Sequence, residues 1–180
     1  MSVRNQLRWW LCVGMGWMSL TSAQAMNNAG KESYALGLAA VQDGNYQTAI
    51  QYLQYALQKG EPHAYAALGN IYSAGPRSIV DFGKAKEAYE QAALRDDVEG
   101  WYGLGKLYAQ GLGVAKSEQL AVHYYVKAAG KYHVQAAYAL GMMYAHGGAN
   151  VAADAPRSRQ YLEQSCLGGW GAACRVLKSK

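Results

Sequence analysis

Ala64-Tyr-Ala-Ala-Leu-Gly-Asn-Ile-Tyr72 decides the fold of this chain, because the same pattern returns twice. It reappears as Gly100-Trp-Tyr-Gly-Leu-Gly-Lys-Leu-Tyr108 and as Ala136-Ala-Tyr-Ala-Leu-Gly-Met-Met-Tyr144, so that the three segments begin 36 residues apart. A second block repeats in phase with the first, at Ala85, Tyr89, Ala92 and Ala93 and then at Ala121, Tyr125, Ala128 and Ala129. A fixed period of about 20 to 50 residues is typical of a solenoid, whose units bury their apolar faces only by stacking on one another.

Each unit is predicted to be a pair of helices joined by a loop. The first pair runs from Lys31 to Gln42 and from Tyr46 to Gln58, with a tight turn at 43–45. Side chains three and four positions apart share one helix face, so the repeated alanines and tyrosines form a packing stripe. The repeated glycine costs about 1 kcal/mol of helix propensity relative to alanine, and we expect it where paired helices touch backbone to backbone.

The small and large residues of the first unit give it a resemblance to a tetratricopeptide repeat, through Gly37, Ala49, Leu53 and Ala56. Later units are four residues longer between their helices, at 75–81 and 111–117. Their pattern of Ala-x-x-x-Leu-Gly-x-x-Tyr, a Gly-rich loop and Ala-x-x-x-Tyr-x-x-Ala-Ala resembles the Sel-one-like repeat family over roughly residues 32–174. The third unit has Lys116-Ser117 where the family has Lys-Asp, which changes only the helix cap.

The fourth unit begins at Val134 and continues through a loop at 147–156 into a helix from Arg157 to Leu167. If Leu162 takes the place of Tyr125, this loop is one residue longer than the others. The predicted fold is therefore all-α: a right-handed α-solenoid of four helix-turn-helix repeats, one tetratricopeptide-like and three Sel-one-like. A short capping helix of about Trp170 to Lys178 closes its C-terminal end.

The N-terminal segment has the features of a secretory signal peptide over residues 1–25. Arg4 and Arg8 precede an apolar run from Trp9 to Leu20, and Ala23-Gln-Ala25 is a small-x-small cleavage site. The run is short for a membrane span, and an uncleaved N-terminal anchor is the alternative. Cleavage near Ala25 leaves the repeat domain, residues 26–180, in the periplasm or outside the cell, with no transmembrane segment.

Charge and cysteine content narrow the classes of partner. The formal charge is +5, and removal of the two arginines of the leader leaves 15 − 12 = +3. Basic and acidic residues are mixed, so no nucleic-acid-binding stripe is indicated. Cys12 lies in the leader, so the exported chain keeps two cysteines, Cys166 and Cys174. Two cysteines in a protein of an oxidising compartment usually form a disulfide. The cysteine-rich secreted branch of the Sel-one-like family joins neighbouring units by a disulfide, so the resemblance implies a Cys166–Cys174 bond.

Motifs for nucleotide, metal or catalytic chemistry are weak. The segment from Gly100 to Lys106 fits a phosphate-binding pattern, but Leu107 replaces the required Ser or Thr, and no strand precedes it. The histidines lack metal-ligand spacing, and the two cysteines are too far apart for a zinc knuckle, so we expect no metal and no cofactor. The histidines, which we expect on ordinary surface or groove positions, are His63, His123, His133 and His146.

The composition favours binding, because 15 tyrosines against one phenylalanine is a skewed use of an amphipathic ring. In the tetratricopeptide arrangement, the concave groove is lined by positions three before and one, four or five after the repeated glycine. The tyrosines there are expected to supply contact area, Asn70 and Gln110 hydrogen bonds to a peptide, and Lys106 a partner for a carboxylate. The set comprises Tyr34, Leu38, Ala66, Asn70, Tyr102, Lys106, Gln110, Tyr138, Met142 and His146.

The hypothesis is thus an exported, non-enzymatic scaffold or adaptor of the bacterial envelope that binds a peptide or partner protein in its groove. A β-lactam-binding or hydrolysing enzyme is the alternative, which rests only on the resemblance to the cysteine-rich branch. A structural spacer, or a solvated concave face without a ligand, is also compatible with the pattern.

Overall fold

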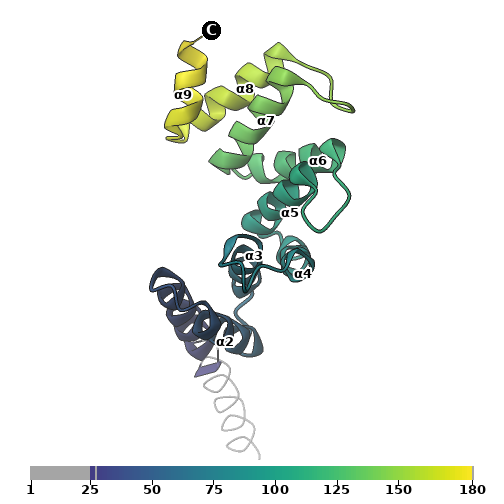
Figure 1. The fold of residues 1–180 in the computed structure, drawn as a ribbon. Coiled ribbons are helices and arrows are strands. Elements are labelled where there is room, and N and C mark those ends of the chain that lie inside the picture. Colours follow the sequence, from purple (N-terminus) through teal and green to yellow (C-terminus); the bar gives the residue numbers. More distant parts are fainter. Residues whose placement is uncertain (1–24, 27, 180) are drawn as a thin grey trace, which may run out of the picture. The chain divides into compact units, whose positions relative to one another are not determined.

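The structure is a computed structural model that describes residues 25, 26 and 28–179. The predicted signal peptide therefore lies outside the described residues, except for Ala25. Every regular element within the described ranges is a helix, as expected for an all-α solenoid. The chain divides into two compact units, residues 1–64 and 65–180, and each is described by itself (Figure 1).

Unit 1 contains a helix over residues 28–42 and the helix α2, Tyr46–Gln58. The prediction for α2 is confirmed at both ends, whereas the first helix starts before the expected Lys31. Gly30 lies in this first helix at a point where the chain just after α2 comes close. A Cβ there would lie 3.2 Å from the backbone oxygen of Lys59, so the absence of a side chain allows this close packing. Gly44, at φ +76°, makes the turn between the two helices.

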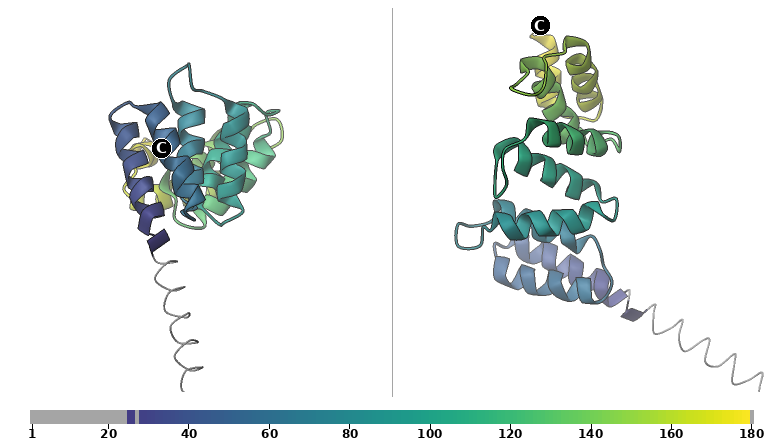
Figure 2. Two further views of the ribbon diagram at one scale, coloured as in Figure 1. Left: turned by 90° about the horizontal axis from the view of Figure 1, so that it is seen from below. Right: turned by 90° about the vertical axis from the view of Figure 1, so that its right-hand side faces the viewer.

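Unit 2 is a stack of seven helices in which each helix from α4 onward packs on the next (Figures 1 and 2). The helices α8 and α9 begin within two residues of the predicted positions. Helix α8 starts at Ala155 where Arg157 was predicted, and α9 starts at Gly171 where Trp170 was predicted. The helices are α3 (Ala64–Ala74), α4 (Phe82–Ala93), α5 (Val98–Gln110), α6 (Glu118–Ala129), α7 (Val134–His146), α8 (Ala155–Leu167) and α9 (Gly171–Lys178).

The repeated glycines receive a side chain from the second helix of their own pair. A Cβ at Gly69 would lie 2.6 Å from the ring of Tyr89, and one at Gly105 would lie 2.5 Å from the ring of Tyr125. The expected backbone-to-backbone contact at these glycines is therefore wrong: the space is filled by an aromatic ring. Backbones do approach closely elsewhere, at Gly100 on α5, where a Cβ would lie 2.7 Å from the amide nitrogen of Ala93.

The fourth repeat confirms the proposed alignment of Leu162 with Tyr125. A Cβ at Gly141 would lie 2.6 Å from Cγ of Leu162, so the leucine occupies the place of the tyrosine ring. In unit 1, Gly37 faces Leu53 in the same way, at 2.8 Å. The glycine thus accommodates a leucine in the first and fourth units and a tyrosine in the second and third.

Each long loop of unit 2 closes through the same backbone hydrogen bond. The backbone carbonyl of the repeated tyrosine accepts a hydrogen bond from the backbone amide of the residue that caps the next helix. The amide nitrogen of Asp81 lies 2.9 Å from the carbonyl oxygen of Tyr72, and that of Ser117 lies 2.9 Å from the carbonyl oxygen of Tyr108. The side chain of Ser117 caps α6 by accepting the amide of Leu120 at 3.3 Å. The Lys-Ser departure in the third repeat therefore still provides a side-chain cap for α6.

The C-terminal end carries the expected disulfide. Cys166 near the end of α8 bonds Cys174 in α9, with Cα atoms 4.9 Å apart. Within the described ranges, the helices are too short or too polar to cross a lipid bilayer.

Candidate partner-binding surface

The predicted groove positions of unit 2 lie on one face of α3, α5 and α7, here called the first-helix face. Side chains along α5 share this face because they are spaced by three or four residues. The predicted groove residues of unit 2 are half-buried or exposed, except Ala66 on α3, which is buried. The face consists of Asn70 on α3, Tyr102, Lys106 and Gln110 on α5, and Tyr138, Met142 and His146 on α7.

Tyr102 packs against two other rings. Its ring lies 4.4 Å from that of His133 and 5.9 Å from that of Tyr125, between centroids. Burial, followed by the nearby charge of Glu99, raises the pKa of the Tyr102 phenol. The ring is therefore a fixed, neutral contact surface with its position set by the next repeat.

Lys106 supplies the positive charge of the face. Its Nζ lies 5.7 Å from the ring centroid of Tyr102, four residues earlier on α5. The ammonium also helps to lower the pKa of Glu99, after the larger effect of a hydrogen bond from His133. A carboxylate of a partner would therefore compete with the Tyr102 ring and the Glu99 carboxylate for the Lys106 ammonium.

His133 connects two repeats, a role that the sequence analysis missed. Its Nδ1 accepts the amide of Ala136 at 3.1 Å and so caps α7, while Nε2 lies 3.1 Å from the Glu99 carboxylate on α5. An Nδ1 atom that accepts this amide carries no hydrogen, which leaves Nε2 as the donor toward Glu99. The expectation of an ordinary surface histidine is wrong for His133, whose position just before a helix was the available signal.

Asn70 has a different role from the one expected. Its amide oxygen accepts the hydroxyl hydrogen of Tyr89 at 2.7 Å, and that hydroxyl also lies 2.8 Å from Oγ of Ser73. Burial raises the pKa of Tyr89 to about 12. The Asn70 oxygen thus serves the packing of α3 on α4 and is already occupied by a hydrogen bond within the protein.

The α7 part of the face carries a phenol ring, a thioether and an imidazole. Tyr138 lies 6.3 Å from Trp170 between ring centroids, in the same register as the Tyr102–His133 pair. Met142 is half-buried, and His146 lies with Nδ1 2.9 Å from the Met142 carbonyl oxygen, one turn earlier. The structure therefore brings Tyr102 and Tyr138 into equivalent positions on consecutive repeats.

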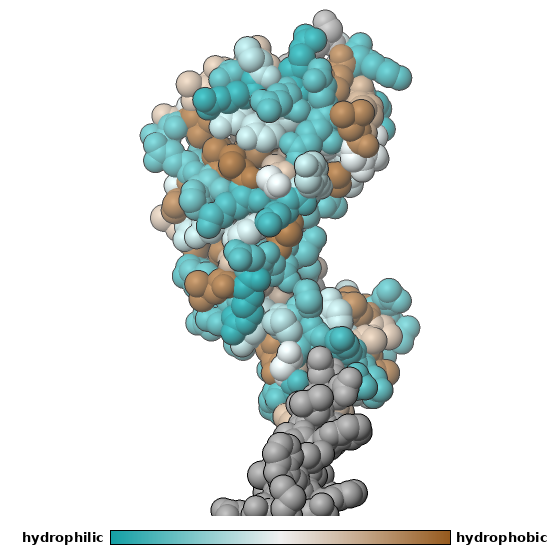
Figure 3. All heavy atoms as spheres, turned by 180° about the vertical axis from the view of Figure 1, so that it is seen from behind, coloured by the Kyte–Doolittle hydropathy of each residue, from teal (hydrophilic) through white to brown (hydrophobic). Residues whose placement is uncertain are grey.

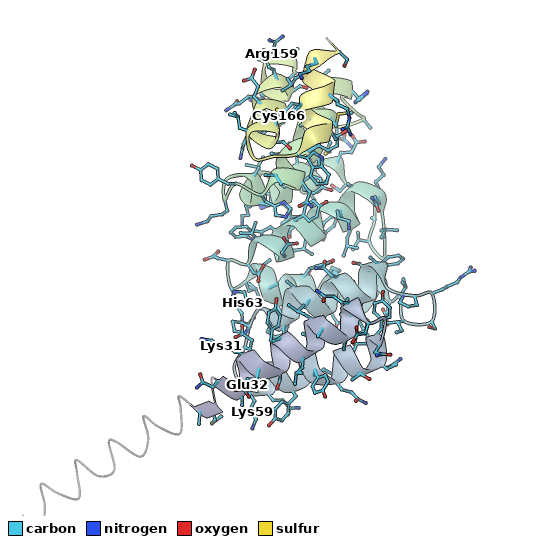
Figure 4. All side chains as sticks on the ribbon, turned by 90° about the vertical axis from the view of Figure 1, so that its left-hand side faces the viewer. Lys31, Glu32, Lys59, His63, Arg159 and Cys166 are labelled. Carbon is cyan, nitrogen blue, oxygen red and sulfur yellow. A yellow bond between two sulfur atoms is a disulfide. The ribbon has the colours of Figure 1, made fainter. Side chains whose placement is uncertain are left out.

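Unit 1 carries the remaining predicted residues, Tyr34 and Leu38. Tyr34 is half-buried with its ring centroid 6.4 Å from that of His63, and Leu38 is exposed. The side chain of Glu61 is buried, and its Oε1 lies 2.7 Å from Nδ1 of His63, within hydrogen-bond distance. Figure 4 labels His63 together with Lys31 and Lys59 of the same unit.

Outside the first-helix face, the surface of the described residues offers cavities rather than metal-binding clusters. In the part of the chain that the structure describes, His, Cys, Asp and Glu form no cluster suited to a metal ion. Figure 3 shows small hydrophobic patches separated by hydrophilic residues on one face of unit 2. Two cavities lie away from the first-helix face, one beside the 150–154 loop and one between α8 and α9.

Comparison with known proteins identifies the repeats. A model of the Sel1 repeat family matches residues 23–61, 62–97, 101–133 and 134–170. A Sel1 repeat protein from Oxalobacter formigenes is similar in structure, with a TM-score of 0.61 and 28% identity over 66% of this chain and 90% of that one. A protective antigen of uropathogenic Escherichia coli with an SLR fold has a TM-score of 0.72 and 27% identity over 88% of this chain; the match spans 34% of the antigen's length. Curated proteins give no match.

Proposed function

The chain belongs to the Sel1 repeat family, and we propose that it is an exported scaffold that binds an extended peptide segment of a partner protein on the first-helix face. Sel1 repeat proteins are generally protein-interaction scaffolds. The disulfide between Cys166 and Cys174 supports export, because such bonds persist mainly in oxidising compartments. The envelope of a bacterium is the proposed location.

One observation carries the choice of surface: the first-helix face varies more from repeat to repeat than the packing positions, which keep the glycine and place a tyrosine or a leucine against it. Register-equivalent positions hold Ala66, Tyr102 and Tyr138, and also Asn70, Lys106 and Met142. Residues that pack between helices are kept similar from unit to unit, as are the glycines described above and the large side chains that face them. A surface that carries rigid rings beside a cation is suited to an extended segment with a carboxylate.

The test compares capture of partner proteins from an envelope extract by matched double variants. We expect Tyr102→Ala with Lys106→Ala to lose the captured partner, whereas Tyr132→Ala with Lys131→Ala should retain it. Tyr132 is 83% exposed on an inter-repeat turn, so the control removes the same residue types from another surface. Thermal unfolding of both variants verifies that they fold, and Lys106→Glu alone tests the charge without removing the Tyr102 ring.

Equal retention by both double variants would show that the first-helix face is not the binding surface. No contact among the described residues favours the β-lactam alternative, which stays a prediction. The test of this alternative is hydrolysis of a chromogenic β-lactam by the oxidised protein. Turnover would show that the protein is an enzyme and would overturn the scaffold proposal.

A further inference from the structure

The most exposed large apolar side chains of unit 2 lie in the turns that lead from a second helix to the next first helix. Leu94, Tyr132 and Leu167 are 77%, 83% and 88% exposed, whereas every other large apolar side chain in the described ranges is at most 52% exposed. They belong to the α4–α5, α6–α7 and α8–α9 turns, one to each. These three residues are here called the turn edge.

The three turns share one backbone geometry. In each, the amide of the residue that precedes the next helix donates to a carbonyl five residues earlier, at 3.0 to 3.2 Å, as in a Schellman motif. The donors are Asp97, His133 and Trp170. Because equivalent positions of stacked repeats lie along one side of a solenoid, the turn edge is a single row and not three unrelated exposures.

Tyr132 occupies a position that usually holds glycine. The residue before the Schellman donor has a left-handed backbone, at φ +64° in Tyr132 and φ +92° in Gly169. The Tyr132 side chain makes no hydrogen bond or ring contact with any described residue, so packing does not compensate for this strain. Gly130 takes the place of Leu94 and Leu167 in the register. The middle turn therefore keeps an apolar side chain at a strained position, which indicates contact with something outside the chain.

The separation of the three side chains distinguishes between possible occupants. Polar residues of the same turns, such as Arg95, Asp96 and Lys131, are exposed between them. A protein partner, including a second copy of this chain, requires a continuous and closely fitted patch. A lipid surface accepts single apolar side chains, because each inserts among the lipids by itself, and tyrosine and leucine both suit the interfacial region.

The charges of the row select among lipid surfaces. Lys127 and Lys131 are exposed on either side of the α6–α7 turn, and no carboxylate of the described residues pairs with them. Asp97 is used as a cap, since its carboxylate accepts the amide of Glu99 at 2.9 Å, and Asp96 is the exposed acid of the α4–α5 turn. The positive charge is therefore concentrated beside Tyr132, where it would meet anionic headgroups.

We propose that the turn edge attaches the protein to the surface of a lipid bilayer that contains anionic lipids. Tyr132, Leu94 and Leu167 insert among the lipids, and Lys127 and Lys131 lie at the phosphates. Leu167 follows the disulfide-bonded Cys166, which Figure 4 labels, so the last of the three turns is held in place by a covalent link. The first-helix face is not part of this surface.

The experiment measures co-sedimentation with vesicles of phosphatidylglycerol and phosphatidylcholine in equal amounts. The oxidised protein comes from the exported fraction, and mass spectrometry verifies that all compared variants have the same N-terminus, so any contribution of residues 1–25 cancels. Tyr132→Gly should weaken vesicle binding about fivefold or more, because it removes an inserted ring. Its thermal midpoint should be equal to or above that of the parent, since glycine suits φ +64°.

The matched control is Leu120→Ser, which removes an exposed leucine from the first turn of α6, at the opposite end of that helix from Tyr132. It should change vesicle binding by no more than about twofold, whereas Leu94→Ser with Leu167→Ser should weaken it about fivefold or more. Lys127→Gln with Lys131→Gln should lower binding to these vesicles and remove its dependence on salt.

Three results would overturn the proposal: no binding to the vesicles, binding that Tyr132→Gly leaves unchanged, or equal weakening by Leu120→Ser and Tyr132→Gly. Analytical ultracentrifugation without lipid adds a fourth, because self-association that Tyr132→Gly abolishes would assign the turn edge to a second copy of the chain.

The outcomes are distinguishable from those at the first-helix face. Tyr102→Ala with Lys106→Ala should bind vesicles as the parent does, and Tyr132→Ala with Lys131→Ala should lose vesicle binding.

Discussion

The inner pair of helices α5 and α6 and the terminal pair α8 and α9 solve the same packing problem by different means. The inner pair has neighbours on both sides, and Gly105 receives the ring of Tyr125 between them. The terminal helix α9 has a neighbour on one side only, and the Cys166–Cys174 bond holds it. Ring packing is thus sufficient inside a stack, whereas an end with little burial relies on a covalent link.

Filling an inner glycine position should give the largest effect. Gly105→Val places a branched side chain where even a Cβ would lie 2.5 Å from Cδ1 of Tyr125. We expect a loss of about 3 kcal/mol in the free energy of unfolding, since the ring has no room to move away. Urea unfolding followed by circular dichroism measures it.

The control for that substitution is Gly171→Ala at the start of α9. A Cβ there would meet only Nη1 of Arg175, at 3.7 Å. It should stabilise the protein by up to about 1 kcal/mol through helix propensity. A Gly105→Val protein as stable as the parent would show that the ring does not fix the helix spacing.

Breaking the terminal link should give the next largest effect. The bond closes a loop with a sequence separation of 8, for which chain entropy predicts about 2 to 3 kcal/mol. Cys166→Ser with Cys174→Ser should lose that stability locally. Hydrogen exchange should speed up in α9 and leave the amides of α5 and α6 protected, and uniform loss of protection would contradict the division between inner and terminal regions.

The two inner tyrosine rings should differ when their hydroxyls are removed. Tyr89→Phe loses contacts to Asn70 and Ser73 and should cost about 1 kcal/mol. Tyr125→Phe should cost clearly less, because Lys106 and Ala109 occupy the equivalent positions. Thermal unfolding of the two variants measures the difference, and equal costs would mean that the rings alone matter.

The smallest effect is expected at the contact between α5 and the start of α7, where Glu99 meets His133. The hydrogen bond from His133 lowers the pKa of Glu99 below its ordinary value of 4.5. A carboxyl with a lowered folded-state pKa stabilises the protein above its unfolded pKa, and this contribution is lost as the pH falls through the folded value. Stability should therefore decline below about pH 4.5, by a small amount because the Glu99 side chain is 51% exposed.

Glu99→Gln should flatten this acidic limb of the stability profile. The control is Glu87→Gln, which alters an exposed acid on α4 and should leave the profile unchanged. Unfolding free energies between about pH 3 and 6 provide the comparison. Identical profiles for the parent and the Glu99→Gln variant would show that the contact does not depend on this charge.

The sequence alone determined the repeat, the helix boundaries and the family. A repeated pattern shows which residues pack, because every unit must satisfy the same neighbours. It therefore identified the glycines, the alignment of Leu162 with Tyr125 and, through the family resemblance, the Cys166–Cys174 bond. The handedness of the solenoid, the signal peptide and the binding face remain predictions.

Only the tertiary structure decided what the repeated and unrepeated residues touch. The period revealed a small residue at Gly69 but not that a ring from Tyr89 fills the space, since either a backbone or a side chain suits a glycine. His133 and Asn70 carried no periodic signal, because each acts once, through a hydrogen bond between side chains that are 34 and 19 residues from their partners. Such contacts depend on how neighbouring repeats bring single polar atoms within reach, which a sequence pattern does not contain.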